Sequence, residues 1–457
     1  MLVGDTICAI STPPGRGGIG VIRLSGPDAL QFALDVFRAP PGSAFDNPNR
    51  AQLGSIVDPR TGIKIDQAVA TWFKAPRSYT GEDVVELSCH GSPPVLALVL
   101  ELLTTRGARI AEPGEFTYRA FFNRRIDLTQ AQAVRDLIDA QTQYQALVAG
   151  RQLEGALSSR LNPFKESLIE IIVQLESSVE FVEDDLTIEA ESGLLKRIEH
   201  LIAGLRELEK SFSFGKFVRE GFDLSIVGRP NVGKSSVFNR LIGSDRAIVT
   251  EVPGTTRDAL YETTSISGVP VRLIDTAGIR ETSDVVESIG ISRTRAAIAD
   301  ADIVLLVIDR SEPLTIEDQN LVESLENRNA IVALNKCDLP EATGSSTIAR
   351  LCASAIEISA LSGQGFDLLT RGIFDRLAGE AGPEREDVLV TDARQHAAVR
   401  AALTSLDVAL GLLKGGELEE IILLKLRGAL ESLGEITGET LNEDILGQIF
   451  STFCIGK

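Results

Sequence analysis

Apolar and polar residues alternate in three different ways along the 457-residue chain. Short apolar runs typical of β-strands occupy residues 20–24 and 67–73, and helix-compatible stretches lie near residues 27–37 and 95–106. Turns rich in Gly and Pro (TPPGRGG, HGSPP, AEPGE) separate these segments, as in connected strands and helices. Residues 1–118 are therefore predicted to form a compact α+β domain.

Helical periodicity dominates two later blocks. From about residue 127 to 210, and again from about 384 to 450, Leu, Ile, Val and Ala recur every three or four residues, as in amphipathic helices. Between them, from about residue 220 to 378, the buried-strand patterns FDLSIV, VRLID, DIVLLVID and AIVALN alternate with helix-length segments. This rhythm indicates a parallel sheet with helices on both faces. We therefore predict an α/β domain inserted into one helical domain, whose two distant arms share a core.

Composition places the chain among cytoplasmic proteins. A chain of 457 residues suggests about three domains, and no apolar run approaches the roughly 18 residues that span a bilayer. The first residues, MLVGDTICAISTPP, lack the basic region and apolar core of a signal peptide. Five scattered cysteines favour a reducing compartment without a disulfide framework. We expect a cytoplasmic protein with no membrane attachment.

Net charge restricts the partners. The 45 basic and 65 acidic residues give a net charge of -20. Proteins that bind nucleic acid mainly through their own surface are usually basic, because neutralising phosphates supplies much of that affinity. A nucleic-acid role therefore needs a local basic patch or a partner protein.

The motif GRPNVGKSS directly follows the strand pattern FDLSIV and precedes a helix-compatible run. It fits the phosphate-binding loop pattern G-x-x-x-x-G-K-[ST] in its required strand–loop–helix setting. Its backbone N–H groups can surround phosphates at a helix N-terminus. Lys234 would neutralise phosphate oxygens and Ser235 would hold Mg²⁺.

Three downstream motifs indicate a guanine nucleotide. DTAG supplies Asp275 toward the metal and Gly278 toward the γ-phosphate. NKCD supplies Asp338, whose carboxylate can accept both N–H donors of guanine, and Lys336, which packs along the base. SAL at residues 359–361 offers a backbone N–H to the guanine oxygen. Each motif follows a strand, where ligands of α/β proteins bind, and together they predict GTP binding.

Residues 220–378 resemble the P-loop GTPases. By that resemblance GTTRD is the first switch, and Thr256 is a second Mg²⁺ ligand beside Ser235. The residues predicted to contact GTP are Asn231, Val232, Gly233, Lys234, Ser235, Ser236, Thr250, Glu251, Val252, Pro253, Gly254, Thr255, Thr256, Asp275, Thr276, Ala277, Gly278, Asn335, Lys336, Asp338, Ser359 and Ala360.

Ile279 follows DTAG where Ras-type enzymes have a glutamine that orients the attacking water. An aliphatic side chain cannot do this, so hydrolysis needs another device. Asn231 matches GTPases that use a K⁺ ion, which would lie between Asn231, Thr250, Val252 and Thr255 beside the developing phosphate charge. The alternative is that Asn231 only stabilises the loop.

The flanking domains separate several GTPase classes: a potassium-dependent ribosome-assembly GTPase, a membrane-remodelling GTPase and a modification enzyme. The sequence has neither a lipid-binding helix with a basic face nor a basic RNA-binding appendage. It carries DTICAISTPPGRGGIGVIRLSG, SYTGEDVVELSCHG, PGEFTYRAFFNRRIDLTQAQAVRDLIDA and a terminal CIGK. With the inserted GTPase, these stretches resemble the MnmE (TrmE) family of tRNA modification GTPases over essentially the whole chain.

The resemblance implies a multidomain fold. An α+β domain at 1–118, similar to tetrahydrofolate-binding domains, dimerises; an all-α helical domain is built from 119–218 and 380–457; and an α/β P-loop GTPase domain at 219–379 is inserted in it. Such a homodimer works with an MnmG (GidA)-like FAD protein. Together they install a 5-carboxymethylaminomethyl or 5-aminomethyl group on the wobble uridine of certain tRNAs, with 5,10-methylene- or 5-formyl-tetrahydrofolate as the one-carbon source.

The resemblance also assigns residues. Arg23, Glu86, Arg125 and Lys457 would contact the folate, with Arg125 standing where the family has Lys. The alternative is that Arg23 and Glu86 are ordinary ion-pair residues. Glu287 lies in the second switch where the family positions its attacking water, or it is a solvated glutamate at a helix start.

The chain ends in STFCIGK. A frayed end is the base-rate expectation for a terminus, and a prenylation signal fits poorly because Gly and Lys follow the Cys and Ile. By the resemblance, the tail folds back so that Lys457 reaches the folate. Cys454 then lies near the chemistry, and its role stays open.

Overall fold

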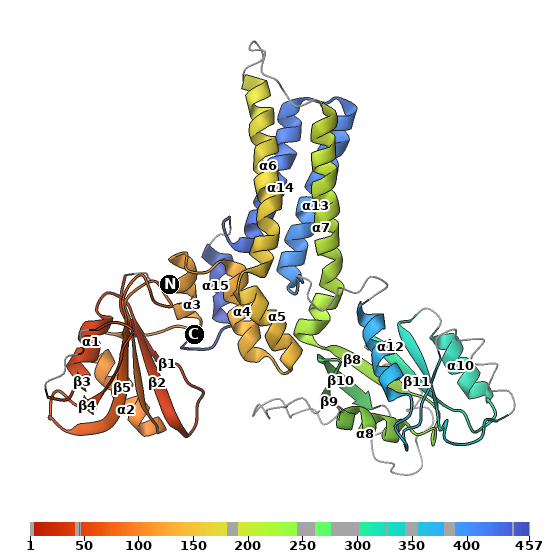
Figure 1. Cartoon of the computed structure of the whole chain (residues 1–457), viewed down its shortest axis with the longest axis horizontal. Helices are drawn as coiled ribbons and strands as arrows, with labels where there is room; N and C mark the ends of the chain where they lie inside the picture. The colour runs from red at the N-terminus through yellow and green to blue at the C-terminus, as the bar shows by residue number, and fades with distance from the viewer. Residues whose placement is uncertain are drawn as a thin grey trace. The chain divides into compact units, whose positions relative to one another are not determined.

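The computed structural model describes residues 4–41, 45, 47–180, 191–244, 261–275, 301–325, 328–342, 355–378, 389–440 and 443–456 (Figure 1). The chain divides into two compact units. One contains Met1–Arg135 together with Gly434–Lys457, and the other contains Asp136–Leu433. The first unit therefore combines the two ends of the chain.

The first unit is built on a seven-stranded sheet of order β3-β4-β5-β6-β2-β1-β7. Its strands are β1 (Ile7–Ile10), β2 (Gly17–Ser25), β3 (Phe37–Arg38), β4 (Ala51–Val57), β5 (Lys64–Phe73), β6 (Val84–Gly91) and β7 (Arg109–Ile110). Only the β1–β7 pair is parallel, so hairpin-like pairing dominates. Helices α1 (Ala29–Val36) and α2 (Pro93–Thr104) pack against β2 and β6, which confirms the predicted α+β domain.

Short helices join the C-terminal segment to this unit. Helix α15 (Glu443–Ser451) packs against α3 (Glu115–Phe122) through aromatic rings. The ring of Phe450, fully buried, lies 5.3 Å from the rings of both Tyr118 and Phe453. Such ring pairs add to the stabilisation from apolar burial, so α15 is held in place by a core of its own.

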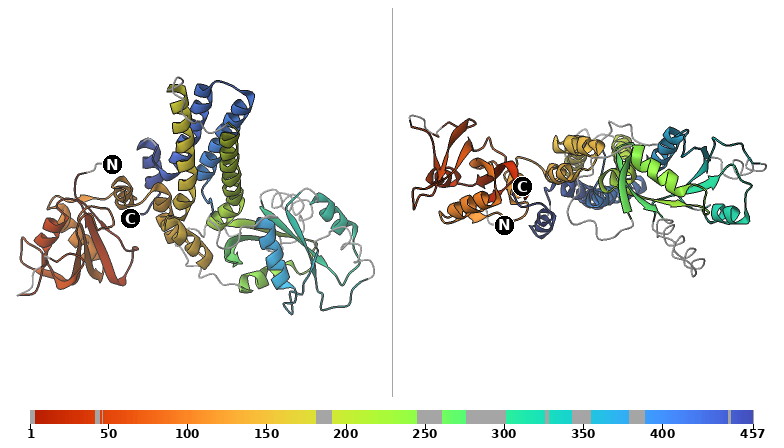
Figure 2. Two further views of the ribbon diagram at one scale, coloured as in Figure 1. Left: turned by 45° about the horizontal axis from the view of Figure 1, so that its top comes forward. Right: turned by 90° about the horizontal axis from the view of Figure 1, so that it is seen from below.

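The second unit contains a bundle of long helices (Figures 1 and 2). The helices before and after the GTPase domain are α4 (Leu128–Asp139), which begins in the first unit, α5 (Gln143–Leu153), α6 (Ala156–Glu180) and α7 (Glu191–Glu220), followed by α13 (Ala393–Gly415) and α14 (Glu419–Thr437). Arg206 of α7 pairs with Asp407 of α13 at 3.1 Å. Arg427 of α14 pairs with Glu176 of α6 at 2.5 Å. Helices from the two distant arms therefore contact one another within this unit.

Helix α13 is the one helix in the described part of the chain that is long and apolar enough to cross a bilayer, judged by length and composition. Its buried residues include Val399, Ala402 and Leu406, and it packs along α7. A helix that lies inside a bundle needs this composition, so burial within the unit accounts for it.

The GTPase domain has a six-stranded sheet of order β13-β12-β11-β8-β10-β9. Its strands are β8 (Phe222–Val227), β9 (Tyr261–Ile266), β10 (Val269–Asp275), β11 (Ile303–Asp309), β12 (Ala330–Asn335) and β13 (Ile356–Glu357). Alternate residues of β11 enter two cores, one with α8 (Lys234–Ser244) and α12 (Phe366–Ala378), the other with α10 (Ile316–Ser324). Burial on both faces explains the unbroken apolar strand patterns.

Strand β9 corrects the expectation of a wholly parallel sheet, because it pairs antiparallel with β10. The turn between them has positive φ angles at Ser267 (52°) and Gly268 (86°), as a two-residue type I′ hairpin requires. Thr142, which caps α5, donates its hydroxyl to the carbonyl of Gly268 at 2.6 Å. The hairpin thus also attaches the GTPase domain to the helical part of the unit.

Candidate functional site

The carboxyl ends of four strands meet at one edge of the GTPase sheet. β8 ends at Val227, β10 at Asp275, β11 at Asp309 and β12 at Asn335, and Asp309 lies directly opposite Asn335 in the register. Ligands of open α/β sheets bind at this edge. The fold therefore brings together the strand ends that precede the phosphate loop and NKCD, with the backbone of Asp275 between them in sequence.

The loop between β8 and α8 has a backbone that glycine makes possible. Gly228 and Gly233 have φ angles of 150° and 97°, and Asn231 has a φ angle of 65°. A Cβ atom on Gly228 would lie 2.3 Å from the carbonyl oxygen of Val307, and one on Gly233 would lie 2.3 Å from Nδ2 of Asn335. These approaches exclude larger residues at both positions.

Lys234 begins α8 and curls back over this loop. Its Nζ donates to the carbonyl of Gly228 at 2.8 Å and to that of Arg229 at 2.7 Å. Ser235 and Ser236 are exposed in the first turn of the helix, where free N–H groups and the helix dipole favour anions. The arrangement offers an ammonium group, hydroxyls and N–H donors to a polyphosphate.

Arg229 anchors the loop from the other side, which sequence reasoning missed. Its Nε lies 2.8 Å from Oδ1 of Asp318. Asp318, whose side chain is almost fully buried, also forms a capping box with Thr315 at the start of α10. A TxxD pattern before an apolar segment could have suggested the cap, but not the ion pair, because Arg229 and Asp318 are far apart in sequence.

Asn335 links the phosphate end of the site to the base end. Its Nδ2 donates to the carbonyl of Val232 at 2.8 Å, and its Oδ1 accepts from the backbone N–H of Ala360 at 3.0 Å. Asn335 is buried, as is Ser359. One amide therefore holds the phosphate loop and the 359–361 loop in a fixed relation.

Lys336 and Asp338 follow Asn335. Lys336 has a φ angle of 66° and its Nζ lies 2.5 Å from Oδ2 of Asp309. Burial alone would raise the pKa of Asp309, but hydrogen bonds from Lys336 and Ser311 outweigh it and hold the pKa below its ordinary value. Asp338 is exposed, so its carboxylate is accessible to a base. In the sequence, Asp309 could have been singled out as the charged residue that ends the apolar strand pattern DIVLLVID.

Several predicted residues lie outside the described residues, and for Asp275 only the backbone, at the end of β10, is described. Those outside are Thr250, Glu251, Val252, Pro253, Gly254, Thr255, Thr256, Thr276, Ala277, Gly278, Glu287 and Lys457.

A second polar cluster lies in the first unit around Arg23 and Glu86, which face each other across β2 and β6. The Arg23 guanidinium donates to Oε1 of Glu86 from Nε at 3.0 Å and from Nη2 at 2.8 Å. Its Cζ lies 5.4 Å from the ring centroid of Tyr79 and 5.7 Å from that of Phe116. Arg23 and Glu86 therefore form an ion pair, as the alternative interpretation expected, and both side chains remain partly exposed.

The C-terminal tail reaches this pair. The carbonyl of Gly456 accepts from Nη1 of Arg23 at 3.4 Å and from the hydroxyl of Ser11 at 3.0 Å. The carbonyl of Cys454 accepts from the N–H of Gly114 at 3.3 Å. Residues 454–456 are therefore hydrogen-bonded to the domain instead of frayed, and the Cys454 side chain is exposed.

Arg125 lies beside the loop that precedes β6. Its Cγ is 3.2 Å from the place that a Cβ on Gly81 would occupy. The neighbouring Asn123 donates from Nδ2 to the carbonyl of Thr80 at 2.7 Å. The segment that carries Asn123 and Arg125 therefore packs against the Thr80–Gly81 loop.

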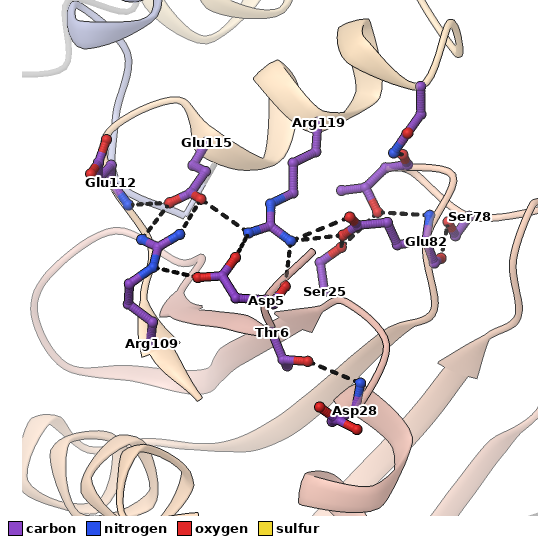
Figure 3. Close-up of polar contacts among 12 residues, drawn as sticks. Asp5, Thr6, Ser25, Asp28, Ser78, Glu82, Arg109, Glu112, Glu115 and Arg119 are labelled. Carbon is purple, nitrogen blue, oxygen red and sulfur yellow. Dashed lines mark hydrogen bonds and ion pairs between the residues drawn. The ribbon is translucent and has the colours of Figure 1, made fainter. Parts of the chain in front are cut away.

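An ion network centred on Arg119 lies in the same domain (Figure 3). The fully buried Arg119 contacts Asp5 at 2.5 Å, Glu82 at 3.1 Å and Glu115 at 3.1 Å. Arg109 bridges Asp5 at 2.7 Å and Glu115 at 2.5 Å. Buried charges are tolerated only when paired in this way. Through Arg119 the network joins α3 to the segments before β1 and β6, which carry Asp5 and Glu82.

The network also lowers the pKa values of two of its carboxyl groups. Burial would raise the pKa of Glu115, but hydrogen bonds from Arg109, the N–H of Glu112 and Arg119 hold that pKa below its ordinary value. The pKa of Asp5 is likewise lowered, because hydrogen bonds from Arg109 and Arg119 outweigh its burial. Both acids are therefore charged at neutral pH.

Comparison with known proteins identifies the family. Residues 6–125 match the family described as GTP-binding protein TrmE N-terminus, and residues 128–454 match the MnmE helical domain. The chain is 49% identical to the tRNA modification GTPase MnmE of Koribacter versatilis (strain Ellin345), with 100% of each chain covered. The chain belongs to the MnmE family of tRNA modification GTPases. The MnmE of Aquifex aeolicus (strain VF5) is 43% identical, over 99% of this chain and 100% of that relative.

Family membership makes the chain a GTP hydrolase of tRNA modification, which confirms the predicted enzyme class and fold class. A solved structure of an Aquifex aeolicus Era variant bound to GDP and AlF4⁻ is 27% identical and covers 40% of this chain and 66% of its own, at a TM-score of 0.28. That score is too low to support an inference about the site.

Proposed function

We propose that this MnmE-family chain, together with an MnmG-like FAD protein, forms 5-carboxymethylaminomethyl or 5-aminomethyl uridine at the wobble position of certain tRNAs. The observation that carries the proposal is the position of the C-terminal tail, hydrogen-bonded beside the Arg23–Glu86 pair in a chain that also has the GTP-binding loops. The hydrogen bond between Arg23 and the carbonyl of Gly456 places the tail at this charged pair, where it could contact a ligand.

The Arg23–Glu86 cluster has the chemistry that a tetrahydrofolate derivative requires. Folates combine a pterin edge with N–H donors and an anionic glutamate tail. Glu86 would accept from the pterin edge, and Arg23, Arg125 and Lys457 would supply positive charge. Tyr79 and Phe116 offer aromatic faces beside Arg23. The one-carbon unit of 5,10-methylene- or 5-formyl-tetrahydrofolate is the proposed donor to uridine.

GTP would be held by the loops described above, with oxygen donors suited to Mg²⁺ at Ser235 and Thr256. Asn231, Thr250, Val252 and Thr255 would hold K⁺ with oxygen atoms, and Glu287 would position the attacking water, directly or through a second water. Asn231, a left-handed residue within the phosphate loop, is exposed, which supports the K⁺ proposal because the residue is accessible to an ion. These cations would supply positive charge to the transferring phosphate.

The acidic composition supports a division of labour between subunits. With a net charge of -20, the chain gains little from phosphate neutralisation, so the MnmG-like partner would provide most of the tRNA surface. The chain would act as a cytoplasmic homodimer joined through residues 1–118. GTP hydrolysis would then drive movement of the paired GTPase domains.

The proposal is tested by reconstitution with the MnmG-like partner, tRNA, GTP, K⁺ and 5,10-methylene-tetrahydrofolate, followed by mass analysis of the wobble nucleoside. Each component is omitted in turn, and Glu86→Gln serves as a variant that keeps the GTP site. We expect loss of the modified base without folate or with Glu86→Gln, at unchanged GTP hydrolysis. Full modification in the absence of any folate would contradict the proposed donor.

A further inference from the structure

Arg240 connects the helix of the phosphate loop to the loop that reads the base. It lies six residues after Lys234 on α8, about 9 Å along the helix axis. Its guanidinium donates from Nη1 to the carbonyls of Ala360 at 3.0 Å and Leu361 at 3.1 Å, and from Nη2 to that of Ser362 at 3.1 Å. One side chain thus binds three successive carbonyls.

These bonds determine which way the loop's N–H groups point. In a trans peptide the C=O and the next N–H are directed oppositely, so the N–H of Leu361 points away from Arg240. Within the residues that the structure describes, that N–H has no hydrogen-bond acceptor, and Leu361 is 84% exposed. The N–H of Ala360 is held on Asn335, the first residue of the guanine motif. The N–H of Leu361 is therefore the donor of this loop that stays available to a bound base.

The surrounding residues are adapted to this contact. Gly363 has a φ angle of 91°, and a Cβ atom there would lie 2.0 Å from Nη2 of Arg240. Cζ of Arg240 lies 5.6 Å from the ring centroid of Phe366, a distance at which a cation is attracted to an aromatic face. Gly363 and Phe366 therefore hold the planar guanidinium group in one orientation. A lysine has a single ammonium group and could not make the same set of hydrogen bonds.

We propose that Arg240 is a positioning residue for guanine selectivity, which holds the 359–362 loop so that the N–H of Leu361 meets the 6-oxo group of the base. Asp338 would read the N1 and 2-amino donors separately. Arg240 therefore supports one half of base recognition, and it does so from the helix that begins at the phosphates.

The test measures affinities of the full-length chain for GTP, inosine triphosphate and the triphosphate of 2-aminopurine riboside, without tRNA, folate or partner. Inosine lacks the 2-amino group, and 2-aminopurine lacks the 6-oxo group and the N1 hydrogen. For Arg240→Ala we expect GTP affinity to fall about tenfold, as for loss of one to two hydrogen bonds. The preference for GTP over the 2-aminopurine nucleotide should shrink by a similar factor, while the preference over inosine triphosphate stays unchanged.

Asn239→Ala, an exposed neighbour on α8, is the matched control and should leave all three affinities unchanged. Arg240→Lys keeps the charge but cannot bind three carbonyls at once, so it should give an intermediate loss of GTP affinity. This variant replaces Arg240→Ala in the test if the alanine variant fails to fold. The proposal is overturned if Arg240→Ala, or the lysine variant in its place, weakens all three nucleotides by one factor or leaves both preferences intact. Because binding alone is measured, failure of the proposed folate chemistry would not alter the result.

Discussion

Replacement of Arg119 by leucine should destabilise the first unit more than any other single arginine change in it. The variant keeps the apolar stem but removes the guanidinium that contacts Asp5, Glu82 and Glu115. In the variant, Arg109 still pairs with Asp5 and Glu115. Glu82 still accepts the hydrogen bond from the hydroxyl of Ser25, at 2.7 Å, but has lost its charged partner. Removing one member of a buried ion pair costs about 3–5 kcal/mol, which for a unit of this size lowers Tm by roughly 6–20 °C.

The pH dependence distinguishes this cause from lost packing. The pKa values of Asp5 and Glu115 lie below their ordinary values of 3.8 and 4.5, so their stabilisation is present above those values and is lost as pH falls through the lowered, folded-state pKa. Without Arg119 those folded pKa values rise. The stability deficit of Arg119→Leu is therefore expected to be largest above about pH 5 and to shrink as the carboxyls are protonated.

The assay is thermal unfolding followed by tryptophan fluorescence. The chain has a single Trp, Trp72, which is buried in β5 of the first unit, so its emission reports on that unit alone. Arg77→Leu, at an exposed position of the same domain, is the matched control and should change stability by less than about 0.5 kcal/mol. Equal midpoints for the two variants at pH 7, or a deficit that stays constant down to pH 3, would refute the reasoning.

Three further results are expected from solution experiments. GTP turnover should be faster in K⁺ than in Na⁺ and should collapse in Glu287→Ala with nucleotide binding retained; equal rates in the two salts would remove the cation device. Deletion of residues 454–457, or Gly456→Ala, whose Cβ would lie 2.4 Å from the carbonyl oxygen of Ile10, should abolish tRNA modification and spare GTP hydrolysis; intact modification would make the tail dispensable. The isolated chain should bind tRNA weakly, and its complex with the MnmG-like partner should bind well; tight binding by the isolated chain that falls steeply with salt would contradict this division of labour.

Most of the fold could be predicted from local patterns of apolar and polar residues. The strand patterns before GRPNVGKSS and NKCD became β8 and β12, since short, mainly apolar runs are typical of strands buried on both faces. The antiparallel β9 was not anticipated, since its direction depends on two positive φ angles at Ser267 and Gly268, and the Ser-Gly pair is a weaker turn signal than Asn-Gly.

Site residues were predictable where they belong to a contiguous motif. Lys234 and Asn335 could be named because phosphate and base recognition place them at fixed spacings within short motifs. Asp318 and Arg240 could not be named in this way. Asp318 contacts Arg229, which is 89 residues away in sequence, and Arg240 contacts Ala360, which is 120 residues away. Charged residues on helices are usually solvated, so only tertiary contacts distinguish these two.

At the proposed folate site, the resemblance and the geometry can be compared directly. The motif resemblance named Arg23 and Glu86, and the β2–β6 register explains why they touch. What periodicity could not provide was the path of the tail, which depends on the left-handed Gly456 and on the packing of Phe450 against α3. Glycine at the third position of CIGK is thus required by the backbone.

Direct binding of 5-formyl-tetrahydrofolate, measured by calorimetry on the full-length chain, tests the central claim that the Arg23–Glu86 pair and the C-terminal tail form a folate site. The account predicts binding to the wild-type chain, and loss of that binding in Glu86→Gln and in the chain lacking residues 454–457, with GTP hydrolysis retained in both. Equal folate binding by all three chains, or its absence from the wild type, would contradict the account.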